Sequence, residues 1–116
     1  DFSMDLNVFN ADAKTIVFNT VKDEIKGNVE FIKIDWNNKA QQVLDYCFKN
    51  GINSLIIEGG TNTVYNFTNV NAWDEARIFV NPHKKFEHGI SAPDLSFHQS
   101  IPTQIGDDLL YTLFNK

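Results

Sequence analysis

The chain has 116 residues and a mass of 13.2 kDa, which is enough for one domain and too short for two of ordinary size. Apolar residues make up 42% and charged residues 22%, a globular composition that excludes a disordered tail or a disulfide scaffold. The net charge is -5 and the longest basic run is Lys84-Lys85, so we expect neither nucleic-acid nor membrane binding.

The first third of the chain predicts two strands. Residues 1–12 mix apolar and polar side chains in near alternation, as in a turn-rich lead-in or an edge strand. β-Branched and aromatic residues predict a strand over residues 14–19, and period-two alternation predicts another over residues 29–34. The polar residues 22–28, with Gly27, join the two strands.

Residues 37–50 predict an amphipathic helix. Apolar side chains recur at positions 40, 43, 44, 47 and 48, which places them on one helical face. Asp35 or Asn37 can cap its start, and Asn50-Gly51 supplies a left-handed end. Cys47 lies within the apolar stripe, so we expect a buried side chain and not a nucleophile.

The second half of the chain predicts further strands around a short helix. The uninterrupted apolar run at residues 52–58 predicts a strand covered on both faces, which would complete a parallel βαβ unit with residues 29–34 and the helix. Gly59-Gly60 ends this run, and residues 61–63 can cap a helix. Beyond it we expect strands over residues 76–80, 95–101 and 109–114, with an exposed loop over residues 82–93.

The segment from Leu55 to Asn62 carries the most chemical information. A buried strand that ends in two glycines before a helix brings backbone N–H groups and the positive end of a helix dipole to one point, where a phosphate can approach closely. Gly-Gly also serves as an ordinary strand-to-helix turn, so both readings stay open. Neither G-x-G-x-x-G nor G-x-x-x-x-G-K-[ST] occurs, which excludes the standard Rossmann and P-loop sites.

Glu58 ends the same apolar run. A carboxylate beside a phosphate is unfavourable, so Glu58 is better suited to accept hydrogen bonds from sugar hydroxyls or substrate amines. The alternative is a solvated carboxylate at the end of a strand.

The remaining polar side chains suggest no metal or acid–base site. His83, His88 and His98 lack a recognised ligand spacing, so we expect no bound metal. Asp74-Glu75 and Asp107-Asp108 are adjacent pairs that would point to opposite faces of a strand, as expected for solvated turns.

The single cysteine cannot form an internal disulfide, and no stretch looks like a signal peptide or a membrane span. By default we therefore expect a cytoplasmic protein.

Four sequence blocks occur in an order and spacing that resemble a known family. They are residues 52–60 (INSLIIEGG), residues 72–75 (AWDE), a strand that closes on Asn81-Pro82, and residues 105–110 (IGDDLL). From residue 14 to the end of the chain, this pattern resembles the reductase domain of the bifunctional riboflavin-biosynthesis deaminase/reductase.

The resemblance implies an α/β fold of the dihydrofolate-reductase-like kind, with a mostly parallel sheet, flanking helices and C-terminal antiparallel strands. It implies an oxidoreductase, usually a homodimer, that uses NADPH to reduce the ribosyl group of 5-amino-6-(5-phosphoribosylamino)uracil to ribityl. The family contains enzymes that reduce before and after deamination, and the sequence does not distinguish these substrates.

The resemblance also assigns roles to individual residues. Glu58 matches the acid that contacts substrate. The loop around the cofactor pyrophosphate corresponds to Gly59, Gly60, Thr61, Asn62 and Thr63, and the adenosine end with its 2′-phosphate corresponds to Asn19 and Thr20. No catalytic residue is identified.

The chain also departs from the family pattern. Thr61 stands where many relatives have proline, and Trp73 replaces a smaller aliphatic residue. The chain starts at Asp1 and its first methionine is Met4, so we expect a single domain over residues 1–116 that is the C-terminal part of a larger reductase domain, inactive when isolated. Two alternatives stay open: a paralogous oxidoreductase with another substrate, and a non-catalytic nucleotide-binding or dimerisation module.

Overall fold

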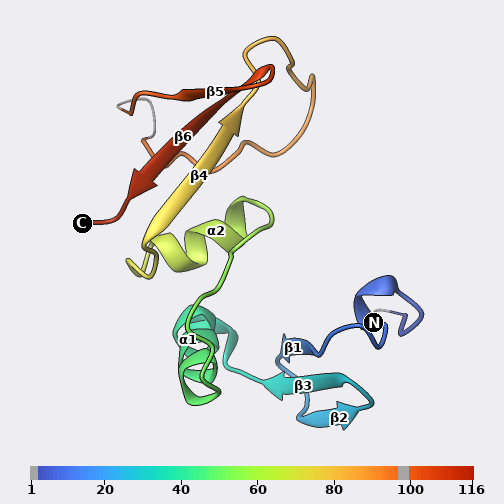
Figure 1. Cartoon of the computed structure of the whole chain (residues 1–116). Helices are drawn as coiled ribbons and strands as arrows, with labels where there is room; N and C mark the ends of the chain where they lie inside the picture. Colours follow the sequence, from blue (N-terminus) through green and yellow to red (C-terminus); the bar gives the residue numbers. More distant parts are fainter. Residues whose placement is uncertain (1–2, 97–99) are drawn as a thin grey trace. The chain divides into compact units, whose positions relative to one another are not determined.

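The computed structural model describes residues 3–96 and 100–116. The chain divides into two compact units, Asp1–Ser54 and Leu55–Lys116, and each is described by itself (Figure 1). Their described residues form two α-helices and two small three-stranded sheets, so the fold is mixed α/β as the sequence predicts.

Unit 1 contains a three-stranded sheet with the order β1-β3-β2. Strands β1 (Thr15–Asn19) and β3 (Val29–Lys33) are parallel, which confirms both predicted strands. Strand β2 (Glu24–Lys26) pairs with β3 in the antiparallel direction and was missed by the sequence analysis. The signal for it is the two-residue loop Gly27-Asn28, in which Gly27 has a φ of 62°.

The predicted helix of unit 1 is confirmed. The 3-10 turn η2 (Trp36–Asn38) leads into α1 (Lys39–Lys49), and the Asp35 carboxylate accepts a hydrogen bond from the Asn37 N–H at 3.0 Å. Gly51 follows the helix with a φ of 69°, a conformation that favours glycine. The buried core of this unit consists of Val29, Ile34, Ala40 and Cys47, so the expected burial of Cys47 is also confirmed.

The N-terminal lead-in of unit 1 forms turns. Within its described residues, the 3-10 turn η1 (Asn7–Phe9) is the regular element. Asn28 donates from its side chain to the carbonyls of Asn10 and Ala13, and Thr15 donates to the Val8 carbonyl at 2.6 Å. These bonds attach the lead-in to the start of β1 and to the β2–β3 turn.

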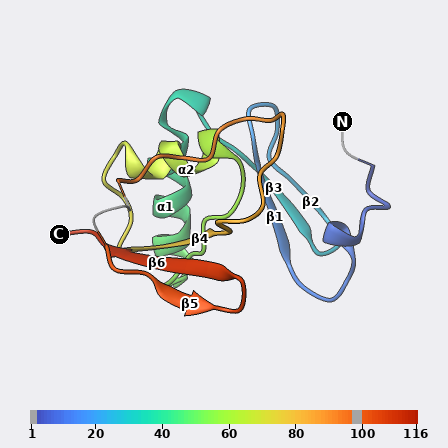
Figure 2. The same ribbon diagram turned by 90° about the horizontal axis from the view of Figure 1, so that it is seen from above.

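Unit 2 contains α2 (Thr61–Thr68) and a second sheet with the order β4-β6-β5. Strands β4 (Glu75–Val80) and β5 (Thr103–Ile105) both pair with β6 (Asp108–Phe114) in the antiparallel direction (Figures 1 and 2). The expected C-terminal antiparallel strands are therefore confirmed. Strand β5 was not predicted, because it has three exposed residues and little apolar pattern.

The predicted strand over residues 52–58 is wrong. These residues adopt no regular structure, and Ile56 is 85% exposed. The proposed βαβ unit with residues 29–34 is therefore not formed, and the parallel pair in the structure is β1 with β3. An apolar run becomes a strand only when a neighbouring strand accepts its backbone hydrogen bonds, and the described residues supply none here.

A mostly parallel sheet is not observed. One of the four strand pairings in the described residues is parallel, and the other three are antiparallel. The strand expected over residues 95–101 is absent at Leu95, Ser96, Ser100 and Ile101, while residues 97–99 lie outside the described part of the chain.

Candidate functional site

The turn that precedes α2 has a backbone that requires glycine at one position. Gly59 has a φ of 135°, and a Cβ atom built on it would lie 3.4 Å from the Thr63 Oγ1. Gly60 has an ordinary φ of -71° and open space around it. Gly59 therefore forms the turn, whereas at Gly60 the missing side chain leaves room beside the backbone.

Gly60 is the N-cap of α2, which corrects the expectation that residues 61–63 cap the helix. Its carbonyl accepts from the Thr63 and Val64 N–H groups at 2.9 and 3.3 Å. Within the described part of the chain, the N–H groups of Gly60, Thr61 and Asn62 donate to no protein acceptor. Free N–H groups at the positive end of a helix can bind an anion such as a phosphate.

The side chains around this turn differ in how they are used. Thr61 donates from its hydroxyl to the Ser91 carbonyl. The side chains of Glu58, Asn62 and Thr63 are exposed and make no hydrogen bond or ion pair with any described residue. These three side chains are free to meet a ligand, and the Thr61 hydroxyl is already used.

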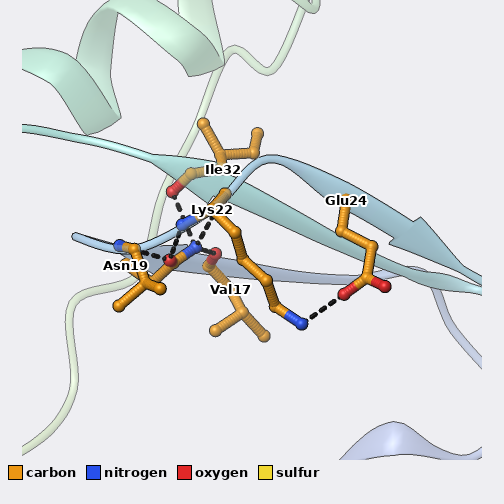
Figure 3. Close-up of polar contacts among 6 residues, drawn as sticks. Val17, Asn19, Lys22, Glu24 and Ile32 are labelled. Atoms are coloured by element: carbon orange, nitrogen blue, oxygen red, sulfur yellow. Dashed lines mark hydrogen bonds and ion pairs between the residues drawn. The ribbon is translucent and has the colours of Figure 1, made fainter.

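Asn19, the second part of the predicted cofactor contact, is fully engaged within unit 1 (Figure 3). Its side-chain amide donates to the carbonyls of Val17, Lys22 and Ile32 at 3.3, 2.9 and 3.2 Å. Its side-chain oxygen accepts from the Val21 and Lys22 N–H groups, both at 2.8 Å.

Asn19 therefore holds the turn after β1 against β3. The neighbouring Thr20 is exposed and makes no side-chain hydrogen bond with a described residue. Asn19 and Thr20 belong to unit 1, whereas residues 58–63 belong to unit 2.

A polar cluster that the sequence analysis missed lies on unit 1. Glu30 on β3 forms an ion pair with Lys14 at 2.6 Å and accepts a hydrogen bond from the Tyr46 hydroxyl on α1 at 3.0 Å. These two bonds, that of Lys14 first, lower the pKa of Glu30 below its usual value. The hydrogen bond between Lys14 and Glu30 raises the pKa of Lys14. Burial raises the pKa of Tyr46, and its own hydrogen bond to Glu30 raises it further.

No linear motif predicts this cluster, because Lys14 and Glu30 are 16 residues apart in the sequence, and Glu30 and Tyr46 are another 16 apart. The Phe18 ring packs edge-on against Tyr46 with a centroid distance of 5.4 Å. The hydrogen bond between Tyr46 and Glu30 joins α1 to the sheet, and the charge of Glu30 is paired with that of Lys14.

Metal sites and membrane-spanning helices are both absent from residues 3–96 and 100–116. No group of three or more His, Cys, Asp or Glu side chains there is arranged to hold a metal ion. No helix in the same residues has the length and apolar character needed to cross a membrane.

The fold and this turn define an α/β protein in which three backbone N–H groups at the start of α2 have no acceptor among the described residues. A family model described as the RibD C-terminal domain matches residues 1–84, nearly three quarters of the chain. The chain therefore belongs to the RibD C-terminal domain family, the reductase domain of riboflavin biosynthesis, as its sequence resemblance predicts. All the candidate site residues lie within the match, whereas the IGDDLL block lies beyond it. No curated protein and no solved structure matches the chain.

Proposed function

We propose that this protein uses NADPH to reduce the ribosyl group of 5-amino-6-(5-phosphoribosylamino)uracil to a ribityl group. Membership of a reductase family supports the reaction class. The observation that carries the proposal is the turn from Glu58 through Gly60 into α2, which leaves three N–H groups free for a pyrophosphate within the matched residues.

The residues of this turn fit the cofactor. The N–H groups of Gly60, Thr61 and Asn62 would donate to pyrophosphate oxygens, and the open space at Gly60 lets a phosphate approach the backbone. The free hydroxyl and amide of Thr63 and Asn62 can add further hydrogen bonds. When bound, NADPH supplies the hydride, and the protein supplies orientation.

Glu58 is proposed to contact the substrate. Its carboxylate is exposed, has no partner among the described residues and adjoins the proposed phosphate site. It can accept hydrogen bonds from two neighbouring sugar hydroxyls, which would hold the sugar in one orientation. The product differs from the substrate by a hydride at sugar C1′ and a proton at the former ring oxygen, and we assign the proton to no residue of this chain.

For the adenosine end we propose a division of work. The Asn19 amide is committed to three carbonyls and two N–H groups, so its role is to shape the turn. The exposed Thr20 hydroxyl on that turn is the group proposed to meet the 2′-phosphate. By family analogy we also propose a cytoplasmic homodimer.

The test uses the full-length protein that contains this sequence. NADPH and NADH oxidation are followed by absorbance with and without the phosphoribosylamino-pyrimidine, and the product is identified by mass spectrometry. We expect substrate-dependent oxidation of NADPH, little with NADH, and a product heavier by two hydrogen atoms. A folded protein that binds NADPH but leaves this pyrimidine unchanged would favour the paralogous oxidoreductase, and one that binds no NADPH would overturn the proposal.

A further inference from the structure

Two hydrogen bonds join α2 to a segment far along the chain. Thr61 donates from its hydroxyl to the Ser91 carbonyl, and the Asp94 N–H donates to the Tyr65 hydroxyl oxygen at 3.0 Å. Thr61 and Tyr65 are four residues apart, so their side chains lie on the same side of the helix. Figure 2 shows the connection after β4 passing beside α2 in unit 2. We call residues 91–94 the strap.

The strap belongs to the connection between β4 and β5, whose described residues make few other hydrogen bonds. Near β4, the Asn81 side chain donates to Asp108 at 2.7 Å and accepts from the His83 and Lys84 N–H groups. From there to the strap, residues 85–90 make no hydrogen bond with any described residue, and Phe86 is 98% exposed. In the described part of the connection, the hydrogen bonds with Thr61 and Tyr65 are therefore the ones that hold the strap beside α2.

We propose that Thr61 and Tyr65 are positioning residues for the candidate cofactor site, because they hold the strap beside the first turn of α2. This inference rests on the proposed function. Thr61 takes part in both features: its N–H is one of the free donors of the turn, and its hydroxyl holds Ser91. The hydroxyl thus acts through the strap and does not contact the cofactor, which revises the role that the family resemblance assigns to Thr61.

Thr61 couples cofactor binding to the attachment of the strap, because it takes part in both. The attached strap restricts the conformations of Thr61 and of the start of α2. Less conformational entropy is therefore lost when the ligand binds. The coupling is reciprocal, so a bound anion must also stabilise the attachment of the strap.

The experiment uses Thr61→Val, Tyr65→Phe and the double variant in the full-length protein, with Thr68→Val as the matched control. Thr68 lies on the same helix, and its hydroxyl donates to the Val64 carbonyl and to no other described residue. The first readout is the dissociation constant of NADPH. Each single variant is expected to weaken NADPH binding by about 3- to 10-fold, the effect of one hydrogen bond, and the double variant by no more than the stronger single one.

The second readout follows the strap without the cofactor. Amide hydrogen exchange at Asp94 and trypsin cleavage after Lys84 and Lys85 should both become faster in Tyr65→Phe and Thr61→Val. Lys84 and Lys85 are the only tryptic sites between Arg77 and Lys116, so the cleavage reports this connection. Saturating NADPH should slow both processes in the wild-type protein.

The outcomes separate the two proposals. Weaker NADPH binding in Thr61→Val with unchanged binding in Tyr65→Phe would mean that Thr61 touches the cofactor directly, which overturns the positioning role. Unchanged exchange and cleavage in both variants would also overturn it. A wild-type protein that binds no NADPH overturns the proposed function, and faster exchange at Asp94 in Tyr65→Phe would then still show the strap attached through Tyr65.

Discussion

The Glu30 carboxylate on β3 accepts a hydrogen bond from the Tyr46 hydroxyl on α1, with 3.0 Å between the two oxygens. The same carboxylate oxygen lies 2.6 Å from the Lys14 ammonium group. One carboxylate therefore joins the approach to β1, the middle strand of the sheet and the helix of unit 1. The ion pair with Lys14 requires the ionised form of Glu30, so we expect the stability of unit 1 to depend on pH.

The stability of unit 1 should decrease in acid because of Glu30. Its pKa is lower in the folded state than its usual value of 4.5, so its contribution is present above that value and is lost as the pH falls through the folded pKa. Glu30→Gln should flatten the dependence of the unfolding free energy on pH over this acid range, measured by urea denaturation. Glu87→Gln, at an exposed carboxylate without a partner among the described residues, is the control. Identical pH profiles for Glu30→Gln and the wild type would contradict the prediction.

Tyr46→Phe should destabilise unit 1 by about 1 kcal/mol, because it removes one hydrogen bond to a charged group while keeping the ring against Phe18. The raised pKa of Tyr46 adds a contribution that is present below 10.0 and is lost as the pH rises through its folded pKa. The measurement is a double-mutant cycle with Glu30→Gln. Additive effects of the two substitutions would show that this bond contributes nothing.

Gly59→Ala should destabilise the turn before α2 by about 1 to 3 kcal/mol, since its φ of 135° is strained for any side chain. Gly60 has an ordinary φ, and a Cβ atom added to it would have no neighbour within 4 Å, so Gly60→Ala should have little effect on the free energy of unfolding. Gly60→Val should instead obstruct the ligand and weaken NADPH binding by more than about tenfold in a protein that stays folded. Thermal denaturation and NADPH titration check these two effects separately, and equal stability losses for both alanine variants would refute the assignment of the turn to Gly59.

Asn19→Ala should destabilise unit 1 by about 2 kcal/mol, because it removes the partner of three carbonyls and two N–H groups at once. Thr20→Ala should leave the unfolding free energy nearly unchanged and weaken the binding of NADPH but not of NADH. Denaturation and titration with both nucleotides measure this contrast. An equal loss for the two nucleotides would exclude contact between Thr20 and the 2′-phosphate.

Glu58→Gln should reduce kcat/KM for the phosphoribosylamino-pyrimidine and leave NADPH affinity nearly intact, because its proposed contact is with the sugar. Steady-state kinetics and NADPH titration in the full-length protein check this. Asn62→Ala, on the same turn, should instead lower NADPH affinity, because Asn62 is proposed to contact the cofactor. If Glu58→Gln weakened only NADPH binding, Glu58 would belong to the cofactor site.

Local patterns were enough to predict α1, β1, β3, β4 and β6. Each has a regular apolar spacing or a run of β-branched residues, and the end of α1 is marked by Asn50-Gly51. The start of α2 after a glycine pair was also visible, although only the structure identifies Gly59 as the strained position and Gly60 as the N-cap. Family membership could also be predicted from the linear sequence, because the blocks at residues 52–60 and 72–75 can be recognised without the fold and lie within the matched residues 1–84.

Tertiary structure alone decided how residues distant in sequence are used. Residues 52–58 have the composition of a buried strand, yet they are unpaired, because strand formation depends on a neighbour that local pattern cannot supply. The amide of Asn19 and the hydroxyl of Thr61 looked free for a ligand, and hydrogen bonds to Ile32 and Ser91 use them instead. Apolar spacing records which face of an element is buried, whereas the partner of a polar side chain is set only when the chain folds back on itself.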